Sequence, residues 1–447
     1  MARSGDIIAA VATPLGRGGV GIVRLSGVDL APIVRAIIGR IPEVRRASKA
    51  AFLDSSGLPL DEGVVLYFRA PHSYTGEDVL ELQGHGGPVV MRMVLSRCTE
   101  LGARLADPGE FTRRAFENNR LDLAQAEAVA DLIDASTEQA AKSALRSLRG
   151  QFSALIQEFE SSLVELRMLV EAGLDFPEEE IDGVDQSDLS GRLVRLQEAV
   201  GRVLSQSRRG SLLRTGIQVV LAGQPNVGKS SLLNRVAGED VAIVTSVAGT
   251  TRDPIRESLN LEGVPLNIID TAGLREASDE VEVLGIQRSW RAIDQADLVL
   301  FLVDATQGLT EADGAIIAKL PAGLRRIVVF NKIDLCSELP RIELASGETR
   351  IYLSAKTGEG IDLLRSALLQ AAGWQSGDED VFIARERHIG ALELVERILV
   401  QARGQLRSPE LMAEELRLAH KALGSIVGEF TPDDLLGEIF SRFCIGK

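Results

Sequence analysis

Apolar residues recur every three or four positions along two stretches near the middle of the chain, which is the spacing of one face of an α-helix. The first stretch consists of Leu145, Leu148, Phe152, Leu155, Phe159, Leu163, Leu166 and Leu169. The second consists of Leu189, Leu193, Leu196, Val200 and Leu204. We therefore expect one long helix and a second helix that runs back beside it. The acidic run Asp175–Glu180 between them predicts a solvated turn rather than a metal site, because no complementary ligand spacing surrounds it.

Helical spacing returns near the end of the chain, at 388–400, 411–427 and 433–443. Both helical blocks carry apolar faces that need cover, and a single domain built from both blocks provides it. We therefore expect a discontinuous all-α helical domain over 120–215 and 376–447, with another domain inserted at 216–375. The two crossing linkers are predicted at Ser205–Gly216 and Trp374–Asp380.

The first third of the chain has a different pattern, in which short runs of β-branched residues are separated by turn-forming residues. The predicted elements are strands at Ile7–Ala12, Gly19–Leu25, Val64–Phe68 and Val79–Leu82, and helices at Ala31–Ile38 and Val89–Leu101. The first two strands enclose the turn Thr13–Gly18, which is typical of a β-loop-β unit. We expect an α+β domain over 1–119.

The inserted segment begins with a buried-strand pattern, Ile217–Ala222, that runs into Gly223–Ser231 and then into a helical segment from Leu232. This is the phosphate-loop pattern, in which glycines let backbone N–H groups turn onto phosphate oxygens. Lys229 adds a positive charge, and the Ser230 hydroxyl is placed to bind a magnesium ion. The context predicts an α/β nucleotide-binding domain.

Two more segments complete the expected phosphate and magnesium site. A strand at Leu266–Ile269 leads into Asp270–Gly273, where the carboxylate can hold magnesium through water and the Gly273 N–H can meet the γ-phosphate. Gly249–Asp253 lies between this segment and the phosphate loop. A threonine hydroxyl and carbonyl there can complete the magnesium shell.

The last two motifs predict guanine as the base. A strand at Ile327–Phe330 leads into Asn331–Asp334, in which the Asp334 carboxylate can accept hydrogen bonds from guanine N1 and N2. Adenine lacks this pair of donors, so its binding would leave the carboxylate unmatched at a cost of about 1–3 kcal/mol or more. A strand at Ile351–Leu353 then leads into Ser354–Lys356, whose Ala355 N–H can meet guanine O6. The four motifs in this order predict GTP.

The expected hydrolysis machinery lacks a common part. In Ras-like switches a glutamine that positions the attacking water follows the switch glycine, whereas here Leu274 follows it. Another group must orient the water, and the nearby candidates are Arg275, Glu276, Glu280 and Glu282. Each of them is otherwise an ordinary charge on a loop, so the pattern alone leaves the choice open.

The composition restricts the partners and the location. The 447 residues contain 49 Lys and Arg against 64 Asp and Glu, and the formal net charge of −15 opposes broad attraction to nucleic acid. No run approaches the roughly 18 apolar residues of a membrane helix, and we expect no membrane contact. Cys98, Cys336 and Cys444 are too scattered for a disulfide framework or a zinc site, which favours the reducing cytoplasm.

One polar, glycine-rich segment of the N-terminal third, Thr75–Gly87, is a candidate ligand site. His85 lies between glycines at a strand end, where it can face a ligand or take the more common structural or solvent-exposed role. Arg24 and Glu81 sit on strand-like runs and can meet a polar ligand across a sheet or simply pair with each other. Both alternatives remain open from the residues alone.

Four segments make the chain resemble a known family, the bacterial tRNA-modification GTPases called MnmE or TrmE. They are Gly76–Gly87, Leu121–Ala128, Gly249–Asp253 and the tail Phe443–Lys447. The resemblance runs from the Thr13–Pro14 turn to Lys447, and other P-loop GTPases share the nucleotide motifs but not the ends. It implies a multidomain fold with an N-terminal α+β folate-binding-like domain, a discontinuous helical domain and an inserted Ras-like α/β GTPase domain.

The resemblance also implies an activity. MnmE-like proteins work with a flavoprotein, MnmG (GidA), which carries FAD, to install an aminomethyl-type group on carbon 5 of the wobble uridine of certain tRNAs. The one-carbon unit comes from 5-formyl-tetrahydrofolate or a related folate, and the N-terminal domain mediates formation of a homodimer. The positions that match the family's folate site are Arg24, Glu81, Arg120 and Lys447. Arg120 stands where the family also has lysine, so the charge is kept but the donor geometry differs.

In the nucleotide domain, the resemblance implies a potassium ion beside the phosphates, in the place where an arginine finger would otherwise act. The matching potassium ligands are Asn226, Thr245, Val247 and Thr250, and the magnesium ligands are Ser230 and Thr251. The implied GTP-binding residues are Asn226, Val227, Gly228, Lys229, Ser230, Ser231, Thr245, Ser246, Val247, Ala248, Gly249, Thr250, Thr251, Asp270, Thr271, Ala272, Gly273, Asn331, Lys332, Asp334, Ser354, Ala355 and Lys356. Glu282 matches the family's water-orienting glutamate. Cys444 is either a nucleophile or a small packed residue.

A second hypothesis is a GTP switch of ribosome assembly, because such proteins share the four nucleotide motifs. They usually carry a basic RNA-binding appendage, and none is evident in this acidic chain. The two hypotheses differ in what they predict for the wobble-uridine nucleosides of cells that lack the protein.

Overall fold

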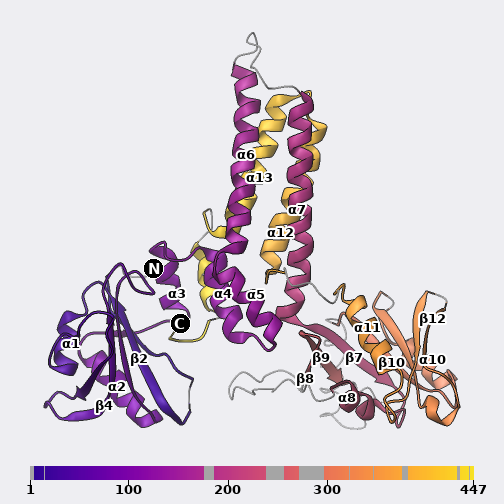
Figure 1. Ribbon diagram of the computed structural model, residues 1–447, viewed down its shortest axis with the longest axis horizontal. Helices are drawn as coiled ribbons and strands as arrows, with labels where there is room; N and C mark the ends of the chain where they lie inside the picture. The colour runs from indigo at the N-terminus through magenta and orange to yellow at the C-terminus, as the bar shows by residue number, and fades with distance from the viewer. Residues whose placement is uncertain are drawn as a thin grey trace. The chain divides into compact units, whose positions relative to one another are not determined.

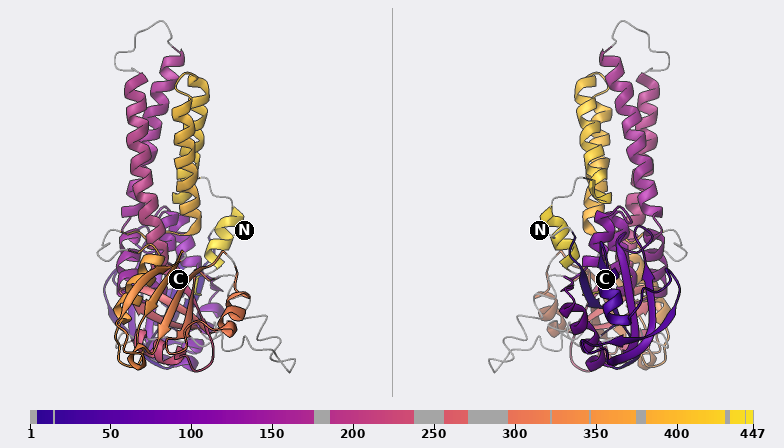
Figure 2. Two further views of the ribbon diagram at one scale, coloured as in Figure 1. Left: turned by 90° about the vertical axis from the view of Figure 1, so that its right-hand side faces the viewer. Right: turned by 90° about the vertical axis from the view of Figure 1, so that its left-hand side faces the viewer.

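The protein consists of two compact units, each formed by segments that are distant in the sequence. In the computed structural model, drawn in Figures 1 and 2, one unit contains Met1–Ala130, Leu148–Val184 and Gln405–Lys447. The other contains Asp131–Ser147 and Asp185–Gly404. The structure describes residues 5–14, 16–175, 186–237, 256–270, 296–321, 323–345, 347–374, 381–429, 433–441 and 443–446.

The N-terminal part of the first unit is a six-stranded sheet in the order β3-β4-β5-β2-β1-β6. Neighbouring strands are antiparallel except β1 and β6, which are parallel. The strands are β1 (Ile8–Val11), β2 (Gly18–Gly27), β3 (Ser48–Leu53), β4 (Pro59–Phe68), β5 (Asp78–Gly86) and β6 (Arg104–Leu105). The antiparallel pairing of β1 with β2 confirms the β-loop-β unit, and the register of β2 and β5 places Arg24 directly opposite Glu81.

One face of this sheet packs against helices. The helices of this region are α1 (Ala31–Ile38), α2 (Pro88–Glu100) and α3 (Glu110–Glu117). Leu80 and Leu82 of β5 share a core with Ile37 of α1 and Val94 of α2. Because side chains alternate across a strand, Glu81 lies on the opposite face of the sheet.

The apolar stripe in the middle of the chain forms two helices, so the prediction of one long helix from Leu145 is wrong. The two helices are α5 (Glu138–Leu148) and α6 (Gln151–Asp175). Gly150 between them has a φ of 80°, a left-handed conformation that ends a helix. The buried apolar positions of α6, with alternating spacings of four and three, are Phe152, Ile156, Phe159, Leu163, Leu166 and Val170.

The second predicted stripe lies on α7 (Gln186–Thr215), and all five of its residues are buried. Because this helix continues to Thr215, the predicted linker at Ser205–Gly216 is wrong. The physical reason is that Leu213 is buried in the core of the nucleotide fold, which extends the helix up to the first strand of that fold. Of the other predicted linker, residues 375–380 lie outside the described residues, as does most of the acidic turn, at 176–180.

The helices near the C-terminus confirm the prediction of a discontinuous helical domain. They are α12 (Glu386–Gly404), α13 (Pro409–Val427) and α14 (Asp433–Ser441). Helix α13 packs along α6 in one unit, and α12 packs along α7 in the other (Figures 1 and 2). Ile439 and Phe440 of α14 and the following Phe443 form an apolar cluster with Leu123 and Ala126 of α4 (Leu123–Asp134). Segments from before and after the inserted fold therefore pack together.

The inserted fold is a seven-stranded sheet in the order β12-β13-β11-β10-β7-β9-β8. Its central strands are parallel, and the edge strands β8 and β12 are antiparallel. The strands are β7 (Ile217–Gly223), β8 (Arg256–Leu261), β9 (Val264–Asp270), β10 (Leu298–Asp304), β11 (Arg325–Asn331), β12 (Arg341–Ala345) and β13 (Glu348–Tyr352). Its described helices are α8 (Lys229–Ala237), α10 (Glu311–Ile317), the short 3-10 helix η1 (Ile333–Leu335) and α11 (Ile361–Ala371). Because the carboxyl ends of parallel strands meet at one edge, the loops after β7, β10, β11 and β13 gather there.

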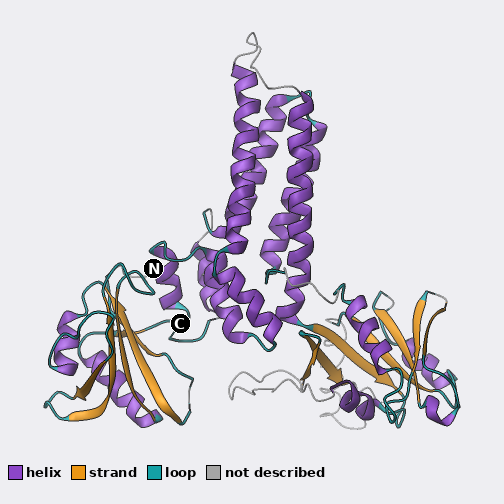
Figure 3. Cartoon of the chain, in the orientation of Figure 1, coloured by secondary structure: helices purple, strands orange, loops and turns teal. Residues whose placement is uncertain are grey.

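The distribution of strands and helices confirms the predicted fold class. Figure 3 shows the strands confined to two sheets, one in an α+β and one in an α/β context, with long helices elsewhere in the chain. The residue boundaries of the three domains stay a prediction. None of the described helices is both long enough and apolar enough to cross a membrane.

Candidate functional site

The loop between β7 and α8 is a cradle for an anion. Lys229 turns back over it, and its Nζ donates hydrogen bonds to the carbonyls of Gly223 at 2.8 Å and Gln224 at 2.9 Å. Gly228 has a φ of 99°, and a Cβ atom there would lie 2.3 Å from Nδ2 of Asn331, so only glycine fits. Asn226 also has a positive φ, 63°. An ammonium group held over a tightly curled backbone at a helix start is what phosphate groups require.

Asn331, the last residue of β11, joins the phosphate loop to the base loop that follows β13. Its side chain is buried, Nδ2 donates to the Val227 carbonyl at 2.8 Å, and Oδ1 accepts from the Ala355 N–H at 2.9 Å. One amide therefore fixes two loops that follow different strands. The Ala355 N–H, which we expected to meet guanine O6, is engaged in this internal hydrogen bond.

Asp334 lies at the same edge of the sheet, on η1. The Ser354 hydroxyl donates to its Oδ1 at 2.6 Å, which orients the carboxylate predicted to recognise guanine. Lys332 makes an ion pair of 2.6 Å with Asp304 at the end of β10. Burial alone would raise the pKa of Asp304, but the hydrogen bonds from Lys332 and Thr306 and the charge of Lys332 hold it below its usual value. The loops after three parallel strands are thus tied together.

Much of the predicted switch machinery lies outside the described residues. Among the predicted site residues these are Thr245, Ser246, Val247, Ala248, Gly249, Thr250, Thr251, Thr271, Ala272, Gly273, Glu282 and Lys447. Leu274 and the other water-orienting candidates, Arg275, Glu276 and Glu280, also lie there, and Asp270 is placed only as the last residue of β9. Of the predicted magnesium ligands, Ser230 is described, at the exposed start of α8. No group of three or more His, Cys, Asp or Glu side chains within the described ranges forms a metal site.

A second constellation lies on the sheet of the first unit, where Arg24 and Glu81 form an ion pair of 2.9 Å. Gln83, two residues further along β5, donates to the other oxygen of Glu81 at 3.2 Å. The Arg24 guanidinium lies 6.0 Å from the ring centre of Tyr74 and 5.8 Å from that of Phe111. The result is a half-buried charged pair whose guanidinium lies near two aromatic rings, a setting that suits a flat polar ligand.

The C-terminal tail reaches the same constellation. Arg24 Nη1 donates to the Gly446 carbonyl at 3.4 Å, and the Gly109 N–H donates to the Cys444 carbonyl at 3.3 Å. The Cys444 side chain is exposed. The structure therefore brings Arg24, Glu81 and the tail together, whereas Arg120 is exposed and its side chain lies beside Gly76, with no hydrogen bond to Arg24 or Glu81.

A buried ionic network holds α3 against this sheet. Arg114 bonds Glu77 at 3.0 Å, Asp6 at 2.7 Å and Glu110 at 3.0 Å, and Glu77 in turn accepts from Ser26 of β2 at 2.8 Å. Burial would raise the pKa of Glu110, but hydrogen bonds from Arg104 and Arg114 lower it below its usual range. Since Ser26 and Arg24 share a face of β2, the network fixes the strand that carries Arg24.

His85 has a defined partner, which favours the structural reading of this residue. Its Nδ1 and its backbone N–H each lie 2.7 Å from the Asp61 carboxylate, and its ring is 75% exposed. Burial would raise the pKa of Asp61, but the hydrogen bonds from His85 lower it below its usual value. The pair joins β4 to β5 at the far end of the strand from Glu81.

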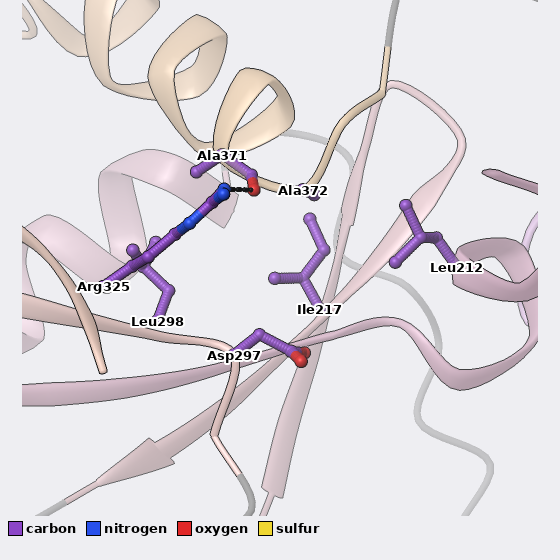
Figure 4. Close-up of a pocket in the computed structure, with 7 residues that line it drawn as sticks. All are labelled: Leu212, Ile217, Asp297, Leu298, Arg325, Ala371 and Ala372. Carbon is purple, nitrogen blue, oxygen red and sulfur yellow. Dashed lines mark hydrogen bonds between the residues drawn. The ribbon is translucent and has the colours of Figure 1, made fainter. Parts of the chain in front are cut away.

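A cavity of about 240 Å³ in the second unit lies away from the nucleotide loops of that unit. It is lined by Leu212, Ile217, Asp297, Leu298, Arg325, Ala371 and Ala372 (Figure 4). Ile217, Leu298 and Arg325 begin β7, β10 and β11, so the cavity lies at the edge of the sheet opposite the nucleotide loops. Arg325 Nη1 closes one side by donating to the Ala371 carbonyl at 2.8 Å. None of the predicted site residues lines this cavity.

The chain matches known proteins over its whole length. A family profile described as "MnmE helical domain" matches residues 123–444, and one described as "GTP-binding protein TrmE N-terminus" matches residues 7–120. The tRNA modification GTPase MnmE of Thiobacillus denitrificans is 61% identical over 442 residues, covering 99% of this chain and 98% of that protein. The chain belongs to the MnmE family of tRNA modification GTPases. The MnmE of Nitrosomonas eutropha, 57% identical over 450 residues and 100% of both chains, agrees.

Solved structures of other GTP-binding proteins are similar to part of the chain. Era of Aquifex aeolicus bound to GDP.AlF4− is 28% identical, covers 40% of this chain and 65% of that chain, and has a TM-score of 0.27. The FeoB G-domain of Methanococcus jannaschii is 25% identical. The match covers 35% of this chain and 96% of that chain, with a TM-score of 0.25. TM-scores this low add nothing to the MnmE assignment.

Membership in the MnmE family establishes the activity at a coarse level. The protein is a GTPase that acts in tRNA modification, and it uses a nucleotide with Mg²⁺ as GTPases of this fold do. This favours the first of the two hypotheses over a ribosome-assembly switch. The roles of individual residues stay predictions.

Several residues of the two constellations escaped the sequence reasoning. Tyr74 directly precedes the candidate ligand segment Thr75–Gly87, and Gln83 lies within it, so their positions in the sequence are a signal for both. Phe111 and the carbonyl of Gly446 gave no signal, because one is an ordinary helical aromatic residue and the other is a backbone group. Arg235 of α8, whose side chain donates hydrogen bonds to the Ala355 and Lys356 carbonyls of the base loop, resembles any charged residue of a helix end.

Proposed function

We propose that this MnmE-family protein is a potassium-activated GTPase that works with the flavoprotein MnmG to modify carbon 5 of the wobble uridine of certain tRNAs. The one-carbon unit is supplied by 5-formyl-tetrahydrofolate or a related folate, and MnmG carries FAD. The protein acts as a homodimer in the cytoplasm and binds its tRNA within a hetero-oligomer with MnmG.

The observation that supports the folate part is the Arg24 constellation. A pterin ring is flat and presents adjacent N–H donors, which suit the Glu81 carboxylate, while the rings of Tyr74 and Phe111 offer apolar contact near Arg24. Folate also carries a glutamate tail, for which the positive charges of Arg120 and Lys447 are suited. In this proposal Arg24, Glu81, Arg120 and Lys447 bind the folate. Cys444, the candidate nucleophile, lies two residues before Gly446, whose carbonyl accepts a hydrogen bond from Arg24.

The folate assignment is tested by titrating the dimeric protein with 5-formyl-tetrahydrofolate. Arg24→Ala and Glu81→Ala should each weaken binding at least ~10-fold, because each leaves its half-buried partner without a counter-charge. GTP turnover should stay in place. Arg46→Ala, which breaks an exposed ion pair with Glu43, is the matched control. Unchanged folate affinity in both site variants would refute the assignment.

The potassium part rests on Asn226, whose left-handed backbone places its side chain at the exposed outer turn of the phosphate loop. A bound cation there, completed by Thr245, Val247 and Thr250, would supply the positive charge that an arginine finger supplies in other GTPases. Magnesium is assigned to Ser230 and Thr251, and Glu282 is assigned the orientation of the attacking water. The other predicted GTP-binding residues, among them the base loop Ser354–Lys356, are also part of this proposal.

Potassium activation is tested by measuring GTP hydrolysis in potassium and sodium salts of equal ionic strength. The wild type should be faster in potassium, and Asn226→Ala should abolish the difference. Asn226→Gly removes the same amide without straining the positive φ and should do the same. Asn234→Ala, an exposed residue of α8, is the control. Equal wild-type rates in both salts would contradict the proposed potassium activation.

The tRNA part is tested in cells. Mass spectrometry of wobble-uridine nucleosides from cells with and without the protein should show loss of the carbon-5 group. Complementation with Glu282→Ala should fail to restore it, because GTP would bind without being hydrolysed at a useful rate. Unchanged nucleosides would contradict the proposed modification while leaving the GTPase activity intact.

A further inference from the structure

Arg235 lies in the last turn of α8, the helix that begins with the phosphate-loop residue Lys229. Its Nε donates a hydrogen bond to the Ala355 carbonyl at 3.2 Å, and its Nη2 donates to the Lys356 carbonyl. A guanidinium group is a rigid, planar fork, so these two bonds fix the orientation of two successive peptide groups at once. The phosphate-loop helix therefore holds the base loop directly, in addition to the link through Asn331.

The backbone donors of the base loop are nearly all occupied. The Ser354 N–H donates to the Glu359 carbonyl at 2.9 Å and the Gly358 N–H to the Ser354 carbonyl at 2.8 Å. The Ala355 N–H is held by Asn331 at 2.9 Å, and the Thr357 N–H donates to the Ser354 hydroxyl at 3.2 Å. Within the described residues, the Lys356 N–H has no partner. It is the one backbone donor of Ser354–Gly358 that remains for a ligand.

The contact with Arg235 determines where this donor points. The Ala355 carbonyl and the Lys356 N–H belong to one planar trans peptide, in which the two bonds point in opposite directions. Because Arg235 holds the carbonyl toward α8, the Lys356 N–H is directed away from α8. The Lys356 carbonyl belongs to the next peptide and is held by the same guanidinium, so the peptide groups on both sides of the Lys356 Cα are fixed.

We propose that Arg235 is a positioning residue for base recognition, which aims the Lys356 N–H at the carbonyl oxygen O6 of guanine. This inference rests on the proposed role of Ser354–Lys356 as the base loop, and it moves the O6 contact from Ala355 to Lys356. Arg235 itself does not touch the nucleotide. Its contribution is to keep a single donor oriented before the base arrives, which lowers the ordering cost of binding.

The test uses the full-length protein and equilibrium binding of three nucleotides. GDP is the reference, 6-thio-GDP replaces only O6 by sulfur, a weak acceptor, and IDP lacks only the 2-amino group that Asp334 is proposed to bind. Arg235→Ala should weaken GDP binding about 5-fold, in line with the loss of one oriented hydrogen bond. The ratio of dissociation constants for 6-thio-GDP and GDP should shrink toward one, whereas the ratio for IDP and GDP should stay as in the wild type.

Two further variants keep the test independent of folding. Arg235→Lys keeps the charge but cannot bind both carbonyls. It should restore only part of the wild-type ratio of dissociation constants for 6-thio-GDP and GDP. Arg325→Ala breaks a comparable bond, from Nη1 to the Ala371 carbonyl at the opposite edge of the sheet, and should change none of the three affinities. A merely structural role of Arg235 would lower all three affinities by one factor and leave both ratios unchanged.

Two results would overturn the proposal. One is an Arg235→Ala protein whose 6-thio-GDP to GDP ratio equals that of the wild type. The other is evidence that these loops do not bind the base at all. In that case Asp334→Asn would leave the preference for GDP over IDP unchanged. A reduced preference in Asp334→Asn together with a shrunken 6-thio ratio in Arg235→Ala supports both assignments.

Discussion

Gly228 shows how closely single residues of the phosphate loop are constrained by a neighbour that lies far away in the sequence. Its φ of 99° is strained for any residue with a side chain, and the position a Cβ would take is 2.3 Å from the Asn331 amide. The Asn331 amide is in turn fixed by Val227 and Ala355. A methyl group at position 228 therefore disturbs two loops and not one.

We expect Gly228→Ala to weaken GDP binding by at least ~10-fold and to lower stability by about 1–2 kcal/mol, from backbone strain and the clash. Binding is measured by titration calorimetry and stability by urea unfolding. Gly308→Ala is the matched control, because Gly308 also has a positive φ, 68°, but a Cβ there meets no atom within 4 Å. Equal GDP affinities in the two variants would contradict the role given to the Asn331 contact.

Glu160 on α6 carries a carboxyl group that is buried, which disfavours its charged form. Its side chain is 9% exposed, and its Oε1 accepts no hydrogen bond from the described residues. Burial, and to a lesser degree the charge of Glu429, raises the pKa of Glu160 to about 7 from 4.5. The group is therefore about half protonated at its helix interface when the surrounding solution is near pH 7.

The sign of the pH dependence follows from this raised pKa. Between about pH 4.5 and 7 the carboxyl ionises in the unfolded state before it ionises in the folded state, so stability falls as the pH rises through this window. The loss is complete above pH 7 and amounts to at most about 3 kcal/mol. We expect Glu160→Gln to be more stable than the wild type at pH 8 and to have a flatter stability profile between pH 5 and 7.

This expectation is checked by urea unfolding at several pH values. Glu158→Gln, an exposed neighbour on the same helix, should leave the profile unchanged. Glu429→Gln should reduce the slope in part, because it removes one of the two causes of the shift. A Glu160→Gln protein with the wild-type slope would show that this carboxyl does not titrate as described.

At the scale of elements, α3 connects the sheet of the first unit to the C-terminal tail. One turn carries Phe111 near Arg24, the next carries Arg114 in the buried ionic network, and Gly109 at its start binds the Cys444 carbonyl. A Cβ on Gly109 would lie 2.7 Å from the Phe440 carbonyl and 2.8 Å from Phe443 Cβ. The close approach of helix and tail thus depends on glycine at this position.

We expect Gly109→Ala to detach the tail. Carboxypeptidase should then remove residues from the C-terminus faster, and the affinity for 5-formyl-tetrahydrofolate should fall several-fold if the tail completes that site. Gly39→Ala is the matched control, because Gly39 has a similar left-handed backbone, with φ 75° against 66°, but open space around it. Equal digestion rates of the two variants would mean that backbone strain, and not the contact with the tail, accounts for any effect.

At the scale of the whole molecule, the strongest expectation is a dimer. We expect light scattering to give about twice the chain mass of 48.1 kDa, both without nucleotide and with GDP, because the proposed dimerisation is constitutive and lies in the N-terminal domain. The same measurement on Asn226→Ala should give the same mass. A mass equal to one chain would contradict the proposed homodimer without affecting the GTPase assignment.

The sequence by itself determined most of the elements and the identity of the chemistry. Helical and strand patterns are local properties, so α1, α2, α13 and the strands β7, β9, β11 and β13 were predicted from them, whereas the edge strands β8 and β12 were not. The phosphate loop, the guanine motif and the family segments were equally readable. The errors occurred where one local pattern continued across a break, at Gly150, and where a distant core extended a helix, at Leu213.

Only the tertiary structure decided which groups meet. Arg24 and the Gly446 carbonyl are separated by 422 positions, and Asn331 joins two loops, one of them 104 positions upstream and the other 24 downstream. The contacts of Arg235 with the base loop are of the same kind. A periodic pattern predicts which face of a helix or strand is buried. It does not predict which segment packs against that face, because many segments could cover it equally well and only the fold of the whole chain determines which one does.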